Sequence, residues 1–136
     1  MKTEAQIPPS DFAVMADFNN LYSAYLEARK GKRWKYAVVR YEANVLENIM
    51  FLHFMLTSRK YRPSPYNYFL VHEPKERLIM YNGFKDKIVQ HSLCDNVLEP
   101  ILSKTFIYDN YASQKGKGTH FGLDRLKAFM QRYYRQ

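Results

Sequence analysis

The sequence predicts a mostly helical α+β fold of about four helices and one β-hairpin. Apolar residues recur at three- and four-residue steps over most of the chain, which is the spacing of an amphipathic helix. One stretch, residues 68–81, instead has two β-prone apolar runs around a polar centre that contains Pro74, which predicts strand, turn and strand. With 136 residues, 46% of them hydrophobic and 16% aromatic, the chain has enough apolar material for one domain or part of one.

The charge balance points to a polyanionic partner. The chain has 21 Lys and Arg against 13 Asp and Glu, a formal net charge of +8. Such an excess favours nucleic acid first and a membrane surface second, although a basic protein without such a partner has the same composition. One cysteine, Cys94, cannot form an internal disulfide, and no run approaches the ~18 apolar residues of a membrane span. The N-terminus lacks the apolar run of a signal peptide, so we expect a cytoplasmic protein with no membrane partner.

The first half of the chain predicts two helices. Ser10 and Asp11 form a helix N-cap signal, and the periodic pattern then runs to about Arg29. A second, longer helix is predicted for residues 34–59, ended by the prolines at 63 and 65. Between the two helices lies a basic cluster that suits either a solvated loop or phosphate contacts, and the residues alone do not separate the two interpretations; its members are Arg29, Lys30, Lys32, Arg33 and Lys35.

The second half begins with the hairpin, which would place Lys75 and Arg77 near its tip. Asn82 and Gly83 predict a turn, followed by a helix from Phe84 to about Pro100 whose lysines at 85 and 87 are exposed. A glycine-rich basic loop, residues 114–120, then leads into a last helix. Its apolar face is predicted to carry Leu123, Leu126, Met130 and Tyr133.

No catalytic or metal-binding set is predicted. His91 and Cys94 stand at a helical spacing, but a zinc site needs three or four ligands, so we interpret the pair as a core thiol beside a polar helix residue. The aspartates are dispersed, whereas metal-dependent nucleotidyl transfer needs them clustered. Asp86 and Asp95 are interpreted as early-helix and solvent-face residues. The loop at Gly116 lacks the spacing of a nucleoside-triphosphatase motif, and it suits either a phosphate contact or a flexible helix entry.

Several short motifs nevertheless follow one another in a familiar order. Tyr61-Arg62-Pro63-Ser64-Pro65 leads into Val71-His72-Glu73-Pro74-Lys75-Glu76-Arg77, and then Phe84-Lys85-Asp86-Lys87-Ile88-Val89-Gln90-His91-Ser92-Leu93 and Leu98-Glu99-Pro100-Ile101 follow. Phe106-Ile107-Tyr108-Asp109-Asn110-Tyr111-Ala112 and Lys115-Gly116-Lys117-Gly118-Thr119-His120 close the series. This series resembles the fingers subdomain of bacterial retron- and group II intron-type reverse transcriptases, which are RNA-directed DNA polymerases.

The resemblance implies roles for particular cations. Lys75 and Arg77 correspond to residues that contact the triphosphate of the incoming deoxynucleotide. Template contacts are implied for the motif at the last helix and for the Tyr-Arg-Pro motif, through Lys115, Gly116, Lys117, His120 and Arg62. The implied partners are template RNA and the RNA/DNA hybrid, with Mg²⁺ as the cofactor of a full-length polymerase and none in this chain.

In that family the catalytic palm aspartates follow the last helix matched here. We therefore expect the chain to be a fingers fragment, excised or naturally truncated, without palm, thumb or metal site and inactive alone. Residues 1–59 would form an N-terminal helical extension and residues 60–136 the fingers-like region. Surface that a palm would cover is expected to promote self-association. The alternative is a stand-alone basic helical interaction module with a polymerase-derived fold and no catalytic role.

Overall fold

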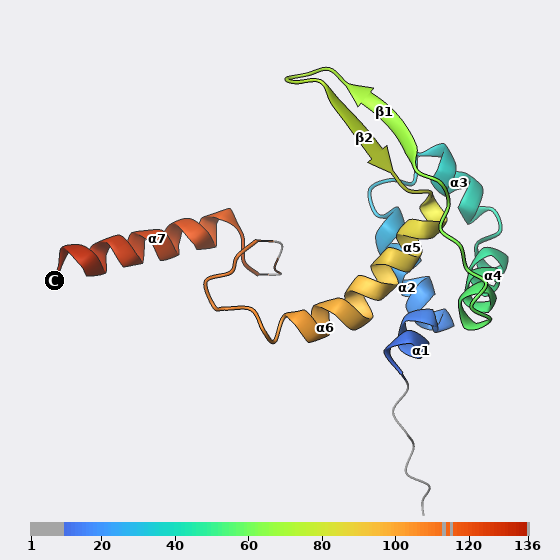
Figure 1. Ribbon diagram of the computed structural model, residues 1–136, viewed down its shortest axis with the longest axis horizontal. Helices are drawn as coiled ribbons and strands as arrows, with labels where there is room; N and C mark the ends of the chain where they lie inside the picture. The colour runs from blue at the N-terminus through green and yellow to red at the C-terminus, as the bar shows by residue number, and fades with distance from the viewer. Residues whose placement is uncertain (1–9, 113, 115, 136) are drawn as a thin grey trace, which may run out of the picture. The chain divides into compact units, whose positions relative to one another are not determined.

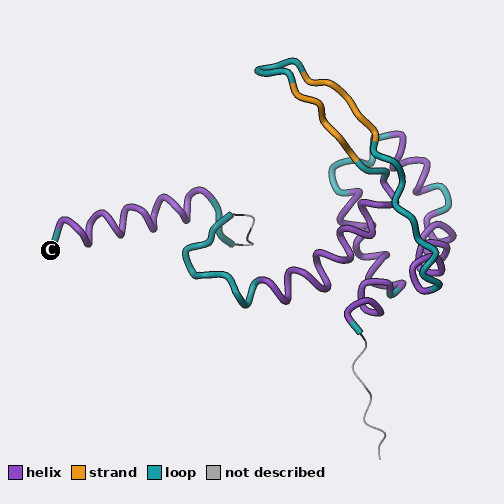
Figure 2. Tube along the Cα trace, viewed as in Figure 1, coloured by secondary structure: helices purple, strands orange, loops and turns teal. Residues whose placement is uncertain are grey.

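The computed structural model describes residues 10–112, 114 and 116–135, and it confirms a mostly helical α+β fold with one antiparallel hairpin (Figures 1 and 2). The elements, in chain order, are α1 (Asp11–Ala16), α2 (Phe18–Arg29), α3 (Tyr36–Glu42), α4 (Val45–Thr57), β1 (Asn67–Val71), β2 (Arg77–Tyr81), α5 (Phe84–Leu93), a π-helical turn (Cys94–Leu98), α6 (Glu99–Leu102) and α7 (Thr119–Tyr134). No helix among these described residues is long and apolar enough to cross a membrane.

The described residues form two compact units, one that ends at Pro100 and one that begins at Ile101. Within the first unit α5 packs on α2, so the helices on either side of residue 59 share one core. The subdivision into an extension and a fingers-like region at that residue remains a prediction.

Each of the two helices predicted in the first half is divided in two. Asp17 has an extended backbone that ends α1, and its carboxylate caps α2 by accepting hydrogen bonds from the backbone N–H groups of Asn19 and Asn20. The second break lies at Asn44, which is also non-helical. There the side-chain amide of Asn48 donates to the Tyr41 carbonyl at 3.0 Å, which satisfies a carbonyl near the end of α3.

The core of the first unit is built from one face each of α2, α4 and α5, closed by the end of α1. Two polar links fix α1 in place: the Ser92 hydroxyl donates to the Met15 carbonyl at 2.7 Å, and His53 Nδ1 donates to the Ala16 carbonyl at 2.7 Å. The buried apolar residues of this core are Met15, Ala16, Leu21, Ala24, Tyr25, Ala28, Ile49, Leu52, Leu56 and Ile88.

A Schellman motif ends α4. The N–H of Lys60 bonds the Met55 carbonyl and the N–H of Arg59 bonds the Leu56 carbonyl, both at 2.9 Å. This motif needs a left-handed residue just after the helix, a position usually taken by glycine, and here Arg59 adopts φ +56°. The motif turns the chain sharply and leads it to Tyr61 and Arg62.

The hairpin pairs β1 and β2 in register from Asn67 opposite Tyr81 to Val71 opposite Arg77. Both faces carry apolar side chains, since paired residues share a face and the face alternates along each strand. Most of these side chains are exposed, and Figure 1 shows the hairpin extending from the helices of its unit. The hairpin therefore has the position and turn that the sequence predicted.

The second unit is held by contacts between the segment before α7 and the helix itself. Arg125 binds the Asp109 carboxylate through two nitrogens, at 2.5 and 3.1 Å, and its guanidinium lies over the rings of Tyr108 and Phe129. Tyr111 packs so closely on α7 that a Cβ added at Gly122 would come within 2.9 Å of its ring. The apolar side chains predicted for one face of this helix are exposed.

Candidate nucleic-acid interface

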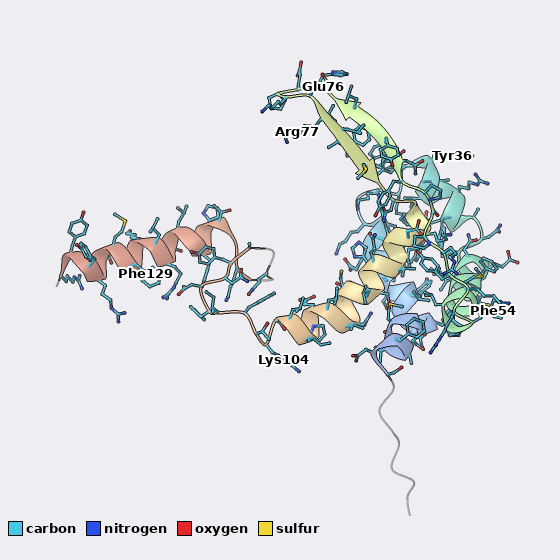
Figure 3. The ribbon with its side chains drawn as sticks, viewed as in Figure 1. Tyr36, Phe54, Glu76, Arg77, Lys104 and Phe129 are labelled. Carbon is cyan, nitrogen blue, oxygen red and sulfur yellow. The ribbon has the colours of Figure 1, made fainter. Side chains whose placement is uncertain are left out.

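The hairpin tip carries the two cations predicted to bind nucleotide phosphates. Arg77 is the first residue of β2, and Lys75 lies in the connecting segment. Both are exposed, and neither side chain forms an ion pair or hydrogen bond with any residue that the structure describes. Figure 3 shows Arg77 at the outer end of the hairpin. Both cations are therefore available to an external phosphate.

Two carboxylates accompany these cations. Glu73 and Glu76 alternate with Lys75 and Arg77, so the tip has no formal net charge when His72 is neutral. At physiological ionic strength charges are screened beyond about 8 Å. The tip thus offers little long-range attraction to an anion, and it would hold a phosphate only by direct contact.

The loop before α7 places its residues in different environments. The Lys117 ammonium donates to the Tyr108 carbonyl at 2.6 Å and lies over the rings of Tyr108 and Phe121. These contacts all lie within the second unit, so the side chain stabilises that unit. Gly116 has φ +75°, a left-handed conformation that favours glycine. His120 is exposed on the first turn of α7, and Lys115 lies outside the described residues.

Sequence reasoning missed the ion pair that anchors this loop to α7. Hydrogen bonding to Arg125 lowers the pKa of the Asp109 carboxyl, and the attraction of Arg125 and Lys117 adds to this effect. Asp109 and Arg125 are sixteen residues apart, and no local pattern links them. The nearest signal was the Tyr-Asp-Asn-Tyr run at residues 108–111 ahead of a basic helix.

The basic cluster between α2 and α3 is partly neutralised. Arg29 and Arg33 pair with Glu42 at 2.5 and 3.4 Å, and hydrogen bonds from Arg29 and Tyr25 lower the pKa of that carboxyl. Lys30 lies 3.6 Å from Glu27. The solvated-loop interpretation therefore fits these three cations, with ion pairs that sequence reasoning did not anticipate.

The remaining two lysines of the cluster, Lys32 and Lys35, lie close enough to Lys87 of α5 to influence its charge. Burial lowers the pKa of Lys87, and the neighbouring charges of Lys32 and Lys35 lower it further. The prediction that Lys85 and Lys87 stay exposed is wrong, since both are half-buried. The Lys87 ammonium lies 5.9 Å from the Tyr81 ring centre. These lysines form a positive surface with no ion pair to any carboxylate in the described ranges.

Arg62 lies in a segment that is fixed to α5 by a buried carboxylate. Asp86 is only 2% exposed and accepts hydrogen bonds from the Tyr61 hydroxyl at 2.5 Å and from the Ser64 N–H at 3.2 Å. The expectation that Asp86 faces solvent is wrong. It stands in the first turn of the helix, as predicted, but its carboxylate points to the preceding segment. This link holds Arg62 beside the start of α5.

The part of the chain that the structure describes contains no group of three His, Cys, Asp or Glu side chains placed to hold a metal ion. His91 lies near Asp95, at 3.9 Å, and Cys94 is exposed, so the interpretation of Cys94 as a core thiol is wrong. The described residues offer cations that can bind anions and aromatic rings on which bases can stack.

No protein-family model matches the chain, and a comparison with curated proteins finds no match.

Proposed function

We propose that this chain is a fingers-like segment of an RNA-directed DNA polymerase of the retron or group II intron type, and that it binds template RNA and nucleotide phosphates. The observation that carries the proposal is the antiparallel hairpin, with Lys75 and Arg77 unpaired with any described residue at its tip. It lies between the Tyr-Arg-Pro motif and α5, in the motif order of that family.

The two hairpin cations suit different contacts with a triphosphate. Arg77 presents a planar fork that binds two phosphate oxygens at once, whereas Lys75 acts as a mobile point charge. Template contacts are proposed for Arg62 in the first unit and, separately, for Gly116, Lys117 and His120 in the second. For Lys117 to reach a phosphate, its ammonium must leave the Tyr108 carbonyl. The described residues bring no acidic cluster together, so we assign this chain binding roles and no metal-dependent step.

An RNA-binding measurement tests the proposal. Wild type and Lys75→Ala/Arg77→Ala are compared by fluorescence anisotropy on a labelled RNA template annealed to a DNA primer, with and without deoxynucleotide. Lys104→Ala/Lys127→Ala removes the same charge from the second unit and serves as the control. We expect the hairpin variant to lose the tightening that the matched deoxynucleotide causes, while the control keeps it. Equal tightening in both variants would contradict the role of the hairpin.

A primer-extension assay tests whether the chain acts alone. With Mg²⁺, deoxynucleotides and primer–template, we expect no extension, because the described residues offer binding groups without a carboxylate cluster. Incorporation above background by this chain would contradict that assignment.

A second candidate function, a protein-interaction module, is favoured by the exposed apolar face of α4. Phe51 and Phe54 are exposed and Met55 is half-buried; Figure 3 marks Phe54 on this helix. Such a face also supports the proposal that the chain self-associates. If wild type binds no RNA at low salt, and if it sediments as an oligomer that Phe51→Ser/Phe54→Ser dissociates, the interaction module is favoured over the polymerase segment.

A further inference from the structure

A groove crosses the first unit between α3, α4 and the start of α5. It consists of two adjoining pockets of about 280 and 860 Å³ that share Tyr41, Asn48 and Lys85 as lining residues. Together they are large enough for a nucleotide-sized ligand, since ligand sites usually enclose about 300–1,000 Å³. All lining residues belong to residues 36–85, so the groove lies within one compact unit.

The charges of the groove have one sign. Four cationic residues line it, and the described lining contains no Asp or Glu; the cations are Arg40, Lys60, Arg62 and Lys85. None of the four forms an ion pair with a described residue. The Asp86 carboxylate does not line the groove, and it accepts hydrogen bonds from the lining residues Tyr61 and Ser64. The hairpin tip, in contrast, has as many carboxylates as cations, so the groove attracts an anion more strongly.

The backbone that carries one of these cations, and the side chain of another, are fixed before any ligand binds. The Asp86 link fixes residues 61–64 on α5, and the Lys85 ammonium lies 5.6 Å from the centre of the Tyr61 ring. Lys85 also stands in the first turn of α5, where the helix dipole disfavours a cation and favours an anion. A bound phosphate would therefore relieve repulsion as well as form new contacts, and the fixed segment would leave only the Arg62 side chain to order.

Exposed aromatic rings border the same groove. Tyr36 on α3 is 77% exposed and Phe51 on α4 is 62% exposed, and each lines one of the two pockets. A ring this exposed contributes little to the core, but it offers a surface on which a nucleobase can stack for roughly 1–3 kcal/mol per base. Cations and rings in one groove match the phosphate and the base of a nucleotide.

We propose that this groove binds a nucleotide unit, with its phosphate at Arg62 and Lys85 and its base against Tyr36 or Phe51. The unit can be presented by single-stranded RNA or by a free nucleotide, since both have the same recognised groups. The proposal rests on the proposed function in taking nucleic acid as the ligand, and it shares Arg62 with the template contacts proposed above. It adds a site that involves neither the hairpin cations nor the loop before α7.

The test uses the full chain and two probes, a fluorescein-labelled oligoadenylate of about six nucleotides and AMP as an unlabelled competitor. Arg62→Gln/Lys85→Gln removes two charges but keeps long side chains, and Lys104→Gln/Lys127→Gln is the matched control. Circular dichroism confirms that each variant is folded. We expect the groove variant to bind the oligonucleotide at least 10-fold more weakly, and to show a slope of log K against log [salt] that is shallower by about 0.7, the value for one lost phosphate contact on a single strand.

A stacking variant separates charge from base contact. Tyr36→Ala/Phe51→Ala is expected to weaken oligonucleotide binding at least 5-fold without changing the salt slope, because the phosphate contacts remain. Displacement of the oligonucleotide by AMP at comparable affinity identifies a site for a free nucleotide, and absence of displacement identifies a strand site.

The groove proposal and the proposed function fail separately. The groove proposal is overturned if the groove variant and the stacking variant both bind the oligonucleotide within 2-fold of wild type. If the groove variant weakens oligonucleotide binding while Lys75→Ala/Arg77→Ala keeps the tightening that the matched deoxynucleotide causes on the primer–template, the groove stands and the hairpin assignment fails. The reverse pattern removes the groove and leaves the hairpin.

Discussion

Replacing Asp86 tests the link between the fold and the candidate interface. Its carboxylate is 2% exposed and accepts the Tyr61 hydroxyl at 2.5 Å and the Ser64 N–H at 3.2 Å. Burial, and then the hydrogen bond to Asp86, raise the pKa of Tyr61, so the phenol stays a donor through neutral pH. Asp86→Ala leaves both donors without this acceptor.

The magnitude follows from these two contacts. A hydrogen bond to a charged group contributes about 1.5–3 kcal/mol, and relief of the buried charge offsets part of the loss. We expect Asp86→Ala to lower the free energy of unfolding by about 3 kcal/mol. Tyr61→Phe removes one of the two bonds and should cost about 1–2 kcal/mol. In the double variant the losses should be less than additive, because both changes break the same bond.

Urea unfolding followed by circular dichroism measures these free energies. Asp95→Ala, which removes an exposed carboxylate shortly after α5, is the control and should stay within about 0.5 kcal/mol of wild type. The reasoning is refuted if Asp86→Ala costs no more than this control, or if the losses from Asp86→Ala and Tyr61→Phe are simply additive.

Three further substitutions test other contacts by the same method. The Tyr41 hydroxyl is buried without a partner among the described residues, so Tyr41→Phe should stabilise the chain by about 1 kcal/mol. Burial raises the pKa of Tyr41 to about 12, so wild type should lose stability as pH rises from 10 towards 12, and Tyr41→Phe should lose less. Arg59→Gly should stabilise by roughly 0.5–1 kcal/mol, because glycine adopts φ +56° without strain; a loss would refute this. Gly122→Ala should destabilise the second unit despite the helix propensity of alanine, because its Cβ would come within 2.9 Å of the Tyr111 ring; unchanged thermal unfolding would contradict this.

Local chemistry made the hairpin and the helical segments predictable. Pro74 between two β-prone runs indicated the turn, and the structure pairs Asn67–Val71 with Arg77–Tyr81. Apolar periodicity likewise located the helices of the first half, but it did not show their division. A side chain that caps, as Asp17 does, or that bonds a carbonyl, as Asn48 does, interrupts a helix without changing its apolar pattern.

Residues whose environment depends on distant partners were harder to predict. Asp86 had the features of a first-turn surface residue, and only the approach of Tyr61, twenty-five positions earlier, buries it. Lys117 was predicted to contact a template, yet its ammonium binds the Tyr108 carbonyl. The groove combines side chains from three helices and the segment after α4, so no single stretch of sequence indicates it.

The salt dependence of RNA binding tests the central claim most directly. For wild type, log K plotted against log [salt] should fall with a slope of about −0.7 for each phosphate contacted, because neutralised phosphates release counterions. In the presence of a matched deoxynucleotide and a primer–template, Lys75→Ala/Arg77→Ala should have a shallower slope than Lys104→Ala/Lys127→Ala. RNA affinity that does not change with salt, or the same slope in both variants, would contradict the claim that the hairpin cations bind nucleotide phosphates.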